Sequence, residues 1–339
     1  MRSRFVAVLI LALVSARSIN AQDSSGEAAT IERILFGSCN RDYRPQPLWK
    51  PILANKPDLW IWLGDIVYGG GPGDKVGLAT RLATQKAQPD YKALHDACPI
   101  IGVWDDNDFG KSDAGGESPT KAANQKLLLD FLDEPPESPR RQQAGLFATY
   151  TYGPLGKQVK VILLDGRYHR EKPGAHADNL GAEQWAWLER QLTASPADVH
   201  LIGSGIQVLS SQHPFEKWAD FPKARQRLLD LLARTGARNV ILLSGDRHFG
   251  EISRLNDPRL KHPLFDLTSS GLTHFAQSGL GNLYADFRKE PNPYRCGEIY
   301  LGLNFGMITF DWEATPRRAT LEIRDEANTV RIEERLTLQ

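Results

Sequence analysis

Polar side chains that can bind metal ions follow directly after apolar, strand-like segments at five places in this 339-residue chain. The segments are Phe36–Asn40 (FGSCN), Trp62–Tyr68 (WLGDIVY), Val103–Asp108 (VWDDND), Leu163–Arg167 (LLDGR) and Leu243–His248 (LSGDRH). Ligands of open α/β sheets bind outside the carboxyl ends of the strands. Neighbouring strand ends would therefore gather these side chains in one crevice.

These side chains include the carboxylates Asp65, Asp106 and Asp246. Carboxylates that converge in a crevice repel one another unless cations offset their charge, so the set indicates a metal site. Asp also favours turns after strands, which is the simpler explanation of Asp65 or Asp246 taken alone. Each of these two follows a glycine that permits a sharp turn beside an ion. The repeated Gly-Asp pair favours the metal site.

The other candidate ligands are Cys39, Tyr68 and His248. Oxygen ligands suit hard cations such as calcium, whereas a thiolate or an imidazole suits a transition metal. The mixed set therefore predicts iron or zinc, with calcium beside it. The structural alternatives are a buried, inert thiol for Cys39 and a packed ring with a hydrogen-bonded hydroxyl for Tyr68.

Further residues near these segments are candidates for handling a substrate. The catalytic candidates are Asp106 and His213, and the candidates for binding the substrate phosphate are Asn40, Arg41 and Arg167. A guanidinium matches phosphate oxygens bidentately. For Arg167, a salt bridge with Asp165 or another carboxylate is an equally good explanation.

The elements that must position these residues alternate between strand and helix in the middle of the chain, and strands dominate the C-terminal third. We expect strands at 31–38, 58–63, 99–104, 147–152, 158–164, 199–204, 239–244, 251–256, 264–268, 299–312, 318–324 and 329–337. We expect helices at 47–55, 75–96 with an interruption at Pro89, 119–132, 182–192 and 221–235. This order predicts one α/β domain with a mixed sheet, or two packed sheets covered by helices.

Composition places the chain among soluble globular proteins, with 41% hydrophobic and 24% charged residues. The formal net charge is zero. Binding to a nucleic-acid backbone usually needs a basic surplus, so composition gives no support to a nucleic-acid binder.

The N-terminus is typical of a secretory signal peptide. Arg2 and Arg4 precede the apolar run Phe5–Val14, and Ala21 ends a plausible cleavage site. The run is short for a membrane span, which takes about 20 residues. We therefore predict a signal peptide at 1–21, a flexible leader at 22–30 and one domain at 31–339. The mature protein would be exported to the periplasm or the extracellular space. A retained membrane anchor is the alternative.

Of the three cysteines, Cys98 and Cys296 could pair.

The motifs GSCN, DLWIWLGDIVY, WDD-x-D-x-G and LSGDRH, in this order between Phe36 and His248, resemble the alkaline phosphatase D (PhoD-like) family. That family belongs to the calcineurin-like metallophosphoesterase superfamily. The resemblance implies a four-layer α/β fold, a two-sheet mixed β-sandwich flanked by helices. It also implies a phosphomonoesterase or phosphodiesterase that uses a metal-bound hydroxide as nucleophile and acts on a small-molecule, lipid or nucleotide phosphoester.

The resemblance also implies which residues bind metal. Iron(III) would be held by Cys39, Asp65, Tyr68 and His248. Asp65 would bridge to calcium(II), and Asp246 and an amide from the motif at Trp104 would complete that second site. Zinc is the other candidate for the transition metal.

The chain departs from the family pattern at one place. The family usually has His where this chain has Asn107, and the expected Asn a few residues later is Ser112. Asn107 could supply the missing amide oxygen if its short side chain reaches the ion. The departure keeps an alternative open, a non-catalytic or weakly active metal-stabilised binding protein of the same fold. A metal-dependent hydrolase of another ester bond is a third possibility.

Overall fold

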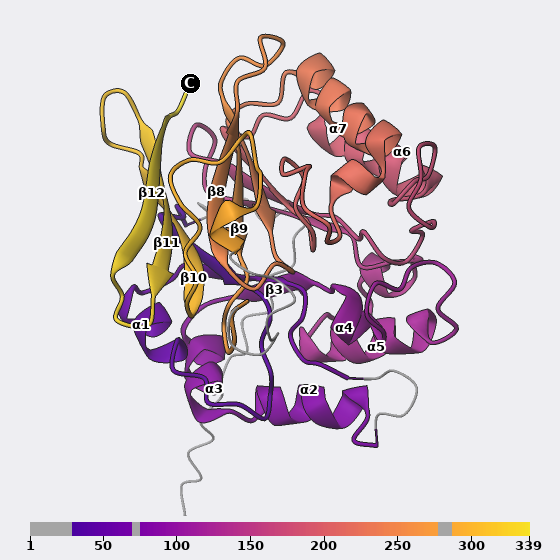
Figure 1. Cartoon of the computed structure of the whole chain (residues 1–339). Coiled ribbons are helices and arrows are strands. Elements are labelled where there is room, and N and C mark those ends of the chain that lie inside the picture. Colours follow the sequence, from indigo (N-terminus) through magenta and orange to yellow (C-terminus); the bar gives the residue numbers. More distant parts are fainter. Residues whose placement is uncertain (1–28, 70–74, 277–286) are drawn as a thin grey trace, which may run out of the picture.

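Two six-stranded sheets pack face to face between two groups of helices (Figure 1). This computed structural model describes residues 29–69, 75–276 and 287–339. The predicted signal peptide, most of the predicted leader and most of the glycine cluster at 69–73 lie outside the described residues. The four layers confirm the fold class that the sequence predicted.

The first sheet combines three parallel strands from the N-terminal part with three antiparallel strands from the C-terminus, in the order β12-β11-β10-β1-β2-β3. Its strands are β1 (Arg33–Gly37), β2 (Leu59–Leu63), β3 (Ile100–Val103), β10 (Asn304–Asp311), β11 (Arg318–Asp325) and β12 (Val330–Thr337). The parallel strands β1, β2 and β3 end beside one another, which places three of the five motifs at one edge.

The second sheet has the order β4-β5-β6-β7-β9-β8, with a parallel centre and antiparallel strands at both edges. Its strands are β4 (Ala148–Tyr152), β5 (Val159–Leu163), β6 (Val199–Gly203), β7 (Val240–Ser244), β8 (Gly250–Leu255) and β9 (Leu264–Ser269). The other two motifs follow β5 and β7.

Helices cover the outer face of each sheet. The helices are α1 (Trp49–Ala54), α2 (Leu78–Lys86), α3 (Pro89–Ala97), α4 (Asp106–Phe109), α5 (Lys121–Phe131), α6 (Ala182–Leu192) and α7 (Pro222–Thr235). The predicted interruption at Pro89 is confirmed, because Pro89 begins α3 at the position where its missing N–H costs nothing. α7 ends at Gly236, which has a left-handed backbone (φ 62°).

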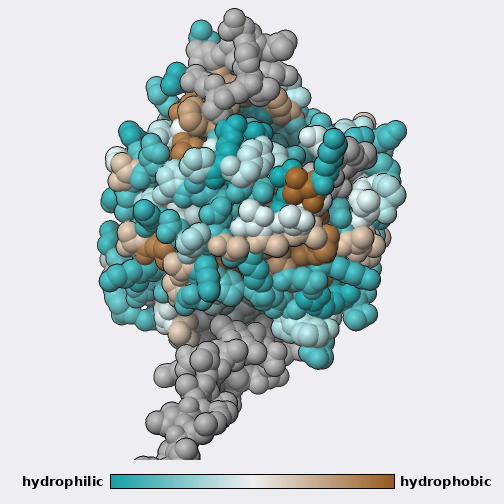
Figure 2. All heavy atoms as spheres, turned by 90° about the horizontal axis from the view of Figure 1, so that it is seen from below, coloured by the Kyte–Doolittle hydropathy of each residue, from teal (hydrophilic) through white to brown (hydrophobic). Residues whose placement is uncertain are grey.

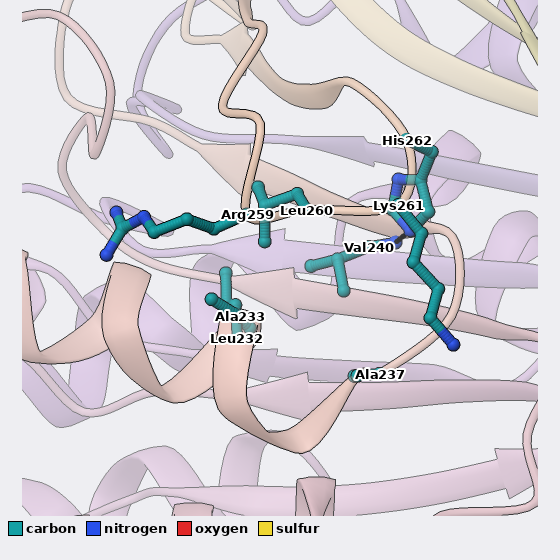
Figure 3. A pocket seen from close by; sticks show the side chains of 9 residues that line it. Leu232, Ala233, Ala237, Val240, Arg259, Leu260, Lys261 and His262 are labelled. Carbon is teal, nitrogen blue, oxygen red and sulfur yellow. Dashed lines mark hydrogen bonds between the residues drawn. The ribbon is translucent and has the colours of Figure 1, made fainter.

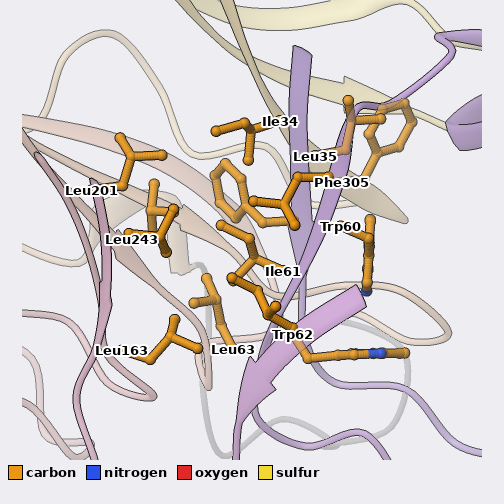
Figure 4. Packing of buried hydrophobic residues seen from close by; sticks show 14 of the residues in the cluster. Ile34, Leu35, Trp60, Ile61, Trp62, Leu63, Leu163, Leu201, Leu243 and Phe305 are labelled. Atoms are coloured by element: carbon orange, nitrogen blue, oxygen red, sulfur yellow. The ribbon is translucent and has the colours of Figure 1, made fainter. Parts of the chain in front are cut away.

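Alternating side chains of the strands fill the two faces of each sheet. Leu163, Leu201 and Leu243 of the second sheet face Ile61 and Leu63 of β2 in the core between the sheets (Figure 4). Trp60 and Trp62 of β2 point to the opposite face, where Trp49 of α1 packs at 5.3 and 5.6 Å between ring centroids. Full burial of a leucine or isoleucine side chain stabilises the folded state by about 2 kcal/mol. The core thus fixes the strand ends that carry the motifs.

Two local predictions were wrong, and a disulfide left open by the sequence does not form. The strand expected at 299–312 begins at Asn304, since Tyr300 forms an isolated bridge with Gly250 instead. The segment after Trp104, where neither helix nor strand was expected, contains α4, which begins with a capping box between Asp105 and Asp108. Cys98 and Cys296 do not pair, because one lies beside β3 at the edge of the first sheet and the other beside β8.

The surface is mainly hydrophilic when the molecule is seen from below, with hydrophobic atoms in small patches and a narrow band (Figure 2). Between α2 and α5 lies a shallow apolar cavity of about 200 Å³, lined by Leu82, Leu127 and Phe131 among others. No helix within the described ranges has both the length and the apolarity needed to cross a membrane.

Candidate metal centre

The carboxyl ends of the parallel strands of both sheets meet at one place and bring the predicted ligands together. Cys39 follows β1, Asp65 follows β2 and His248 follows β7. Ligand atoms of these three residues all lie within 4.8 Å of one another. The sequence expectation of one crevice is therefore met across the two sheets.

The backbone at these positions is unusual for residues that have a Cβ. Four predicted ligands have positive φ angles: Cys39 (61°), Asp65 (50°), Asp246 (69°) and His248 (58°). Such left-handed conformations are uncommon outside glycine, and they concentrate at functional sites, where the surrounding structure holds them in place. The fold thus uses strained turns to aim these side chains at a common point.

The first group of potential ligands has a thiol, a carboxylate, a phenol and an imidazole. The Cys39 Sγ lies 3.5 Å from Asp65 Oδ2, and the Tyr68 hydroxyl lies 3.1 Å from His248 Nε2. Cys39 and Asp65 are fully or almost fully buried, and Tyr68 and His248 are partly exposed. This soft and hard donor mixture fits a transition metal better than calcium.

A second group shares Asp65 with the first. Asp65, Asp105 and Asp106 bring carboxylate oxygens within 4.8 Å of one another. The Asn107 amide nitrogen donates to both Asp65 oxygens at 3.2 Å and to Asp106 Oδ1 at 2.8 Å, so the amide would have to turn its oxygen inward to bind an ion. The short side chain of Asn107 therefore does reach the cluster, from the first turn of α4. Oxygen-rich clusters of this kind suit a hard cation.

A third group shares Asp106 with the second, because ligand atoms of Asp106, Asp113 and Glu216 also lie within 4.8 Å of one another. The three groups together form a row of possible ligands, which we call the acidic row. Two arginines offset the negative charge at the Glu216 end of the row. Arg167 contacts Asp105 Oδ1 and Glu216 Oε2 at 2.6 Å each, and Arg170 pairs with the other Glu216 oxygen. These two cations hold the pKa of Glu216 down to about 2 despite its burial.

Arg167 is therefore an ion-pair residue in this structure, as the structural alternative predicted, although its partners are Asp105 and Glu216 rather than Asp165. Its side chain is 2% exposed. Asp165 instead accepts backbone N–H groups of Leu146, Arg167 and Tyr168. The three guanidinium nitrogens of Arg167 donate to Asp105, Ala114 and Glu216 of the described residues.

The other two candidates for substrate phosphate differ from each other. The Asn40 amide donates to Ile66 O and Gln85 Oε1 and is fully buried, so it is a structural group rather than a substrate contact. The Arg41 guanidinium lies 4.8 Å above the centre of the Tyr68 ring, beside the first group. Arg41 is thus the candidate that lies where a substrate phosphate could meet it.

Of two further sequence candidates, Asp246 lies near enough for its charge to act on Asp65 and Asp105, whereas His213 lies beside Phe215. Burial raises the pKa of Asp246 to about 7, and the charge of Asp106 adds to the shift. Burial lowers the pKa of His213 to about 2, helped by the charges of Arg247 and Lys217. His213 therefore carries no spare proton near neutral pH, which argues against the predicted role as a general acid.

The acidic groups of the centre repel one another strongly. Burial raises the pKa of Asp65 well above its usual range, and the charges of Asp106 and Asp108 add to it. Burial, with the charge of Asp65, also raises the pKa values of Cys39 and Tyr68. Burial lowers the pKa of His248 to about 4, so its ring is neutral. Bound cations would reverse the repulsion, and neutral imidazole is the form that binds metal. The residues present therefore fit a metal centre.

Sequence reasoning missed several residues of this centre. Asp105, Asp113 and Glu216 complete the acidic row, and Ser270 and His274 flank the first group after β9. The strand at 264–268 was predicted, and the polar pair Ser269-Ser270 follows it as in the five motifs, so the same rule would have found Ser270. Glu216 arrives on a long loop, and no local pattern marks it.

A small cavity elsewhere has different chemistry. About 40 Å³ lies between the end of α7 and the segment before β9, lined by residues that include Val240, Arg259 and His262 (Figure 3). No carboxylate lines it, and a space of this size holds no more than a few waters. The row of ligand groups at the strand ends is therefore the candidate site.

Comparisons with known proteins identify a family that this chain matches in sequence. The sequence model of the PhoD-like phosphatase family matches residues 36–287. Alkaline phosphatase D of Bacillus subtilis (strain 168) is 23% identical over 288 residues, which cover 69% of this chain and 48% of that protein. The chain thus spans about half the length of this curated relative.

Solved structures share the fold. A structure of PhoD superposes with a TM-score of 0.69 at 20% identity, covering 93% of this chain and 70% of that one. Purple acid phosphatase PPD1 from yellow lupin (Lupinus luteus) seeds gives 0.58 at 13% identity, covering 91% and 54%. GAP50, the anchor in the inner membrane complex of Plasmodium, gives 0.55 at 13%, covering 92% and 90%. With the family match over most of the chain and the four motifs at one centre, the chain belongs to the PhoD-like phosphatase family.

Proposed function

We propose that this protein is a metal-dependent phosphoester hydrolase. The single observation that carries the proposal is the shared Asp65, which belongs to a group suited to a transition metal and to a group suited to a hard cation. When two cations are bound close together, they lower the pKa of a water molecule and clamp the attacking and leaving oxygens of a phosphoryl group.

Two sets of residues would bind the two metal ions. Cys39, Tyr68 and His248 would hold the transition metal with Asp65, and we infer iron(III) from the thiol and phenol donors. Asp106, Asp246 and the Asn107 amide would hold a calcium ion on the other side of Asp65. Zinc in place of iron is the competing assignment, and elemental analysis of the purified protein distinguishes the two.

Positive charge near the first group supports an anionic substrate. Arg41 lies over the Tyr68 ring, and one nitrogen of its guanidinium, Nε, is buried without a hydrogen-bond partner among the described residues. A guanidinium in this place would orient a phosphate oxygen. We propose small phosphomonoesters or phosphodiesters as substrates, including lipid or nucleotide esters.

Replacing the shared carboxylate tests the proposal. Asp65→Asn should lower turnover of an aryl phosphate ester at least about 100-fold, because even changes one shell beyond a metal commonly cost 10–100-fold. Steady-state kinetics with monoester and diester substrates, after loading with iron and calcium, gives the measurement. Circular dichroism shows whether the variant is folded.

Asp311→Asn is the matched control, since Asp311 is at the exposed end of β10, far along the chain from every motif. It should hydrolyse the ester at the wild-type rate. Full activity of Asp65→Asn would refute the bridging role.

One observation favours the alternative of a non-catalytic, metal-stabilised binding protein. GAP50 has this fold and is named as an anchor, and fold alone does not determine function. If the wild-type protein binds both metals but hydrolyses no monoester or diester, the alternative replaces the enzyme.

We also propose that the protein is exported, on the strength of Arg2, Arg4 and the apolar run Phe5–Val14. Cell fractionation and N-terminal sequencing of the mature protein test this. A mature N-terminus near Gln22 in the periplasm or medium is the expected result, and an uncleaved cytoplasmic protein is the contrary one.

A further inference from the structure

A serine that belongs to none of the predicted motifs connects two of the metal-binding candidates. Ser270 follows β9 and is fully buried. Its hydroxyl oxygen accepts the backbone N–H of His248 at 2.8 Å and lies 2.9 Å from Cys39 Sγ. One hydroxyl thus contacts a residue from the end of β7 and a residue from the end of β1.

The directions of these hydrogen bonds follow from counting protons. The His248 N–H occupies one lone pair of the Ser270 oxygen, which leaves its single hydrogen free. The Cys39 thiol can direct its own hydrogen to Asp65 Oδ2, 3.5 Å away. Either atom can donate in this contact while Cys39 is a thiol, but once the sulfur is a thiolate, the form that binds metal, only Ser270 can donate to it. A thiolate is a stronger acceptor than a thiol, because hydrogen bonds to a charged group are the stronger ones.

The same hydroxyl also stabilises strained backbone. Both Cys39 (φ 61°) and His248 (φ 58°) are in the left-handed region. A residue in this region persists only when its surroundings hold it. The neighbouring Ser269 differs, because its hydroxyl donates to Asn304 Oδ1 at 3.0 Å, away from the ligands.

We propose that Ser270 is a positioning residue of the metal centre: its hydroxyl holds His248 in its turn and donates to the Cys39 thiolate, setting both the geometry and the electron donation of the sulfur. Partners one shell beyond the metal commonly tune affinity in this way. This inference rests on the proposed metal-dependent function, and its test separates the two.

Cobalt(II) titration of the metal-free protein gives a readout that does not need turnover. Cobalt bound to a thiolate produces a sulfur-to-cobalt charge-transfer band, whose energy and intensity report on the sulfur. Ser270→Ala should bind cobalt about 10- to 100-fold more weakly. Its charge-transfer band should shift to lower energy, since a sulfur without a hydrogen-bond donor gives up its electron more easily.

Ser269→Ala is the matched control, a buried serine one residue away that should keep the wild-type affinity and band. Ser270→Thr keeps the hydroxyl and should restore the band energy. If wild type shows the band and Ser270→Ala has the same band and affinity, the role of Ser270 is refuted while the metal centre stands. If wild type itself shows no sulfur band, the proposed metal centre fails. If Ser270→Ala does not fold, a wild-type band energy in Ser270→Thr still supports the proposal, and an altered energy contradicts it.

Discussion

At the scale of single residues, the centre combines strained turns with side chains that resist ionisation. Asp65 is the clearest example, since it has a positive φ of 50° and a pKa that burial and neighbouring carboxylates raise. Neither feature improves the stability of a metal-free protein. Both become useful when a cation binds, because the cation attracts the charge that the protein alone would repel.

Arg167 allows a test at this scale. Arg167→Met should destabilise the protein by about 3 to 5 kcal/mol, because it leaves Asp105 and Glu216 buried without their cation. Urea denaturation measures this. Arg234→Met removes an exposed pair with Glu189 and should change stability little. Unchanged stability of Arg167→Met together with a raised KM would instead support the phosphate-binding role first predicted from the sequence.

At the scale of elements, the ends of β2 and β3 approach each other so closely that a side chain is excluded. Gly64 has φ 88°, and a Cβ there would overlap the backbone nitrogen and the Cβ of Asp105. Asp105 begins the capping box of α4 and pairs with Arg167. This glycine therefore sets the distance between Asp65 and the carboxylates of α4.

Gly64→Ala and Gly156→Ala together separate the effect of backbone strain from the effect of close approach. Gly156 has nearly the same φ, 89°, but nothing lies within 4 Å of an added Cβ. Gly156→Ala should cost about 1 to 2 kcal/mol from the left-handed backbone alone. Gly64→Ala should cost about 1 to 3 kcal/mol more, from overpacking, and should weaken metal binding. Equal losses of stability in thermal unfolding would show that the approach of β2 to β3 does not matter.

At the scale of the whole molecule, a chain of zero formal net charge gathers five of its 41 Asp and Glu residues where two sheets end. The arrangement costs stability without metal, and a metal that binds the folded state should recover it. Bound at 100 times its dissociation constant, a ligand adds about 3 kcal/mol.

Removing metal should therefore lower the melting temperature, and more so at higher pH. Burial raises the folded-state pKa of Asp246 to about 7, above its ordinary 3.8. Stability linked to such a group is complete below the ordinary pKa and is lost as pH rises through about 7, by roughly 4 kcal/mol in the metal-free protein. Bound cations offset this loss.

Calorimetry with and without a chelator, at about pH 5 and about pH 8, measures the difference. The metal-dependent rise in melting temperature should be larger at the higher pH. Asp246→Asn is the control: it cannot ionise, so the metal-free variant should lose less stability between the two pH values. A rise that is equal at both pH values in the wild type would contradict the prediction.

The sequence by itself determined the strands, the long helices and the places where ligands could occur. Runs such as Leu59–Leu63 and residues 240–243 are apolar throughout because both faces of a parallel sheet are buried, and this pattern is local. The Gly-Asp turns after them are local too. Cys39, Asp65, Tyr68, Asp246 and His248 could therefore be named from the chain alone.

Tertiary structure decided which of these side chains meet and which partners they have. Glu216 and Ser270 reach the centre from segments distant in the sequence. Arg167 forms ion pairs with Asp105 and Glu216 rather than with a substrate. Asn40 turns inward to Gln85, and Cys98 and Cys296 lie at separate sheet edges. These outcomes depend on how the sheets and helices pack against one another. Periodicity along one strand carries no information about that packing, because it records which face is buried and not what lies opposite.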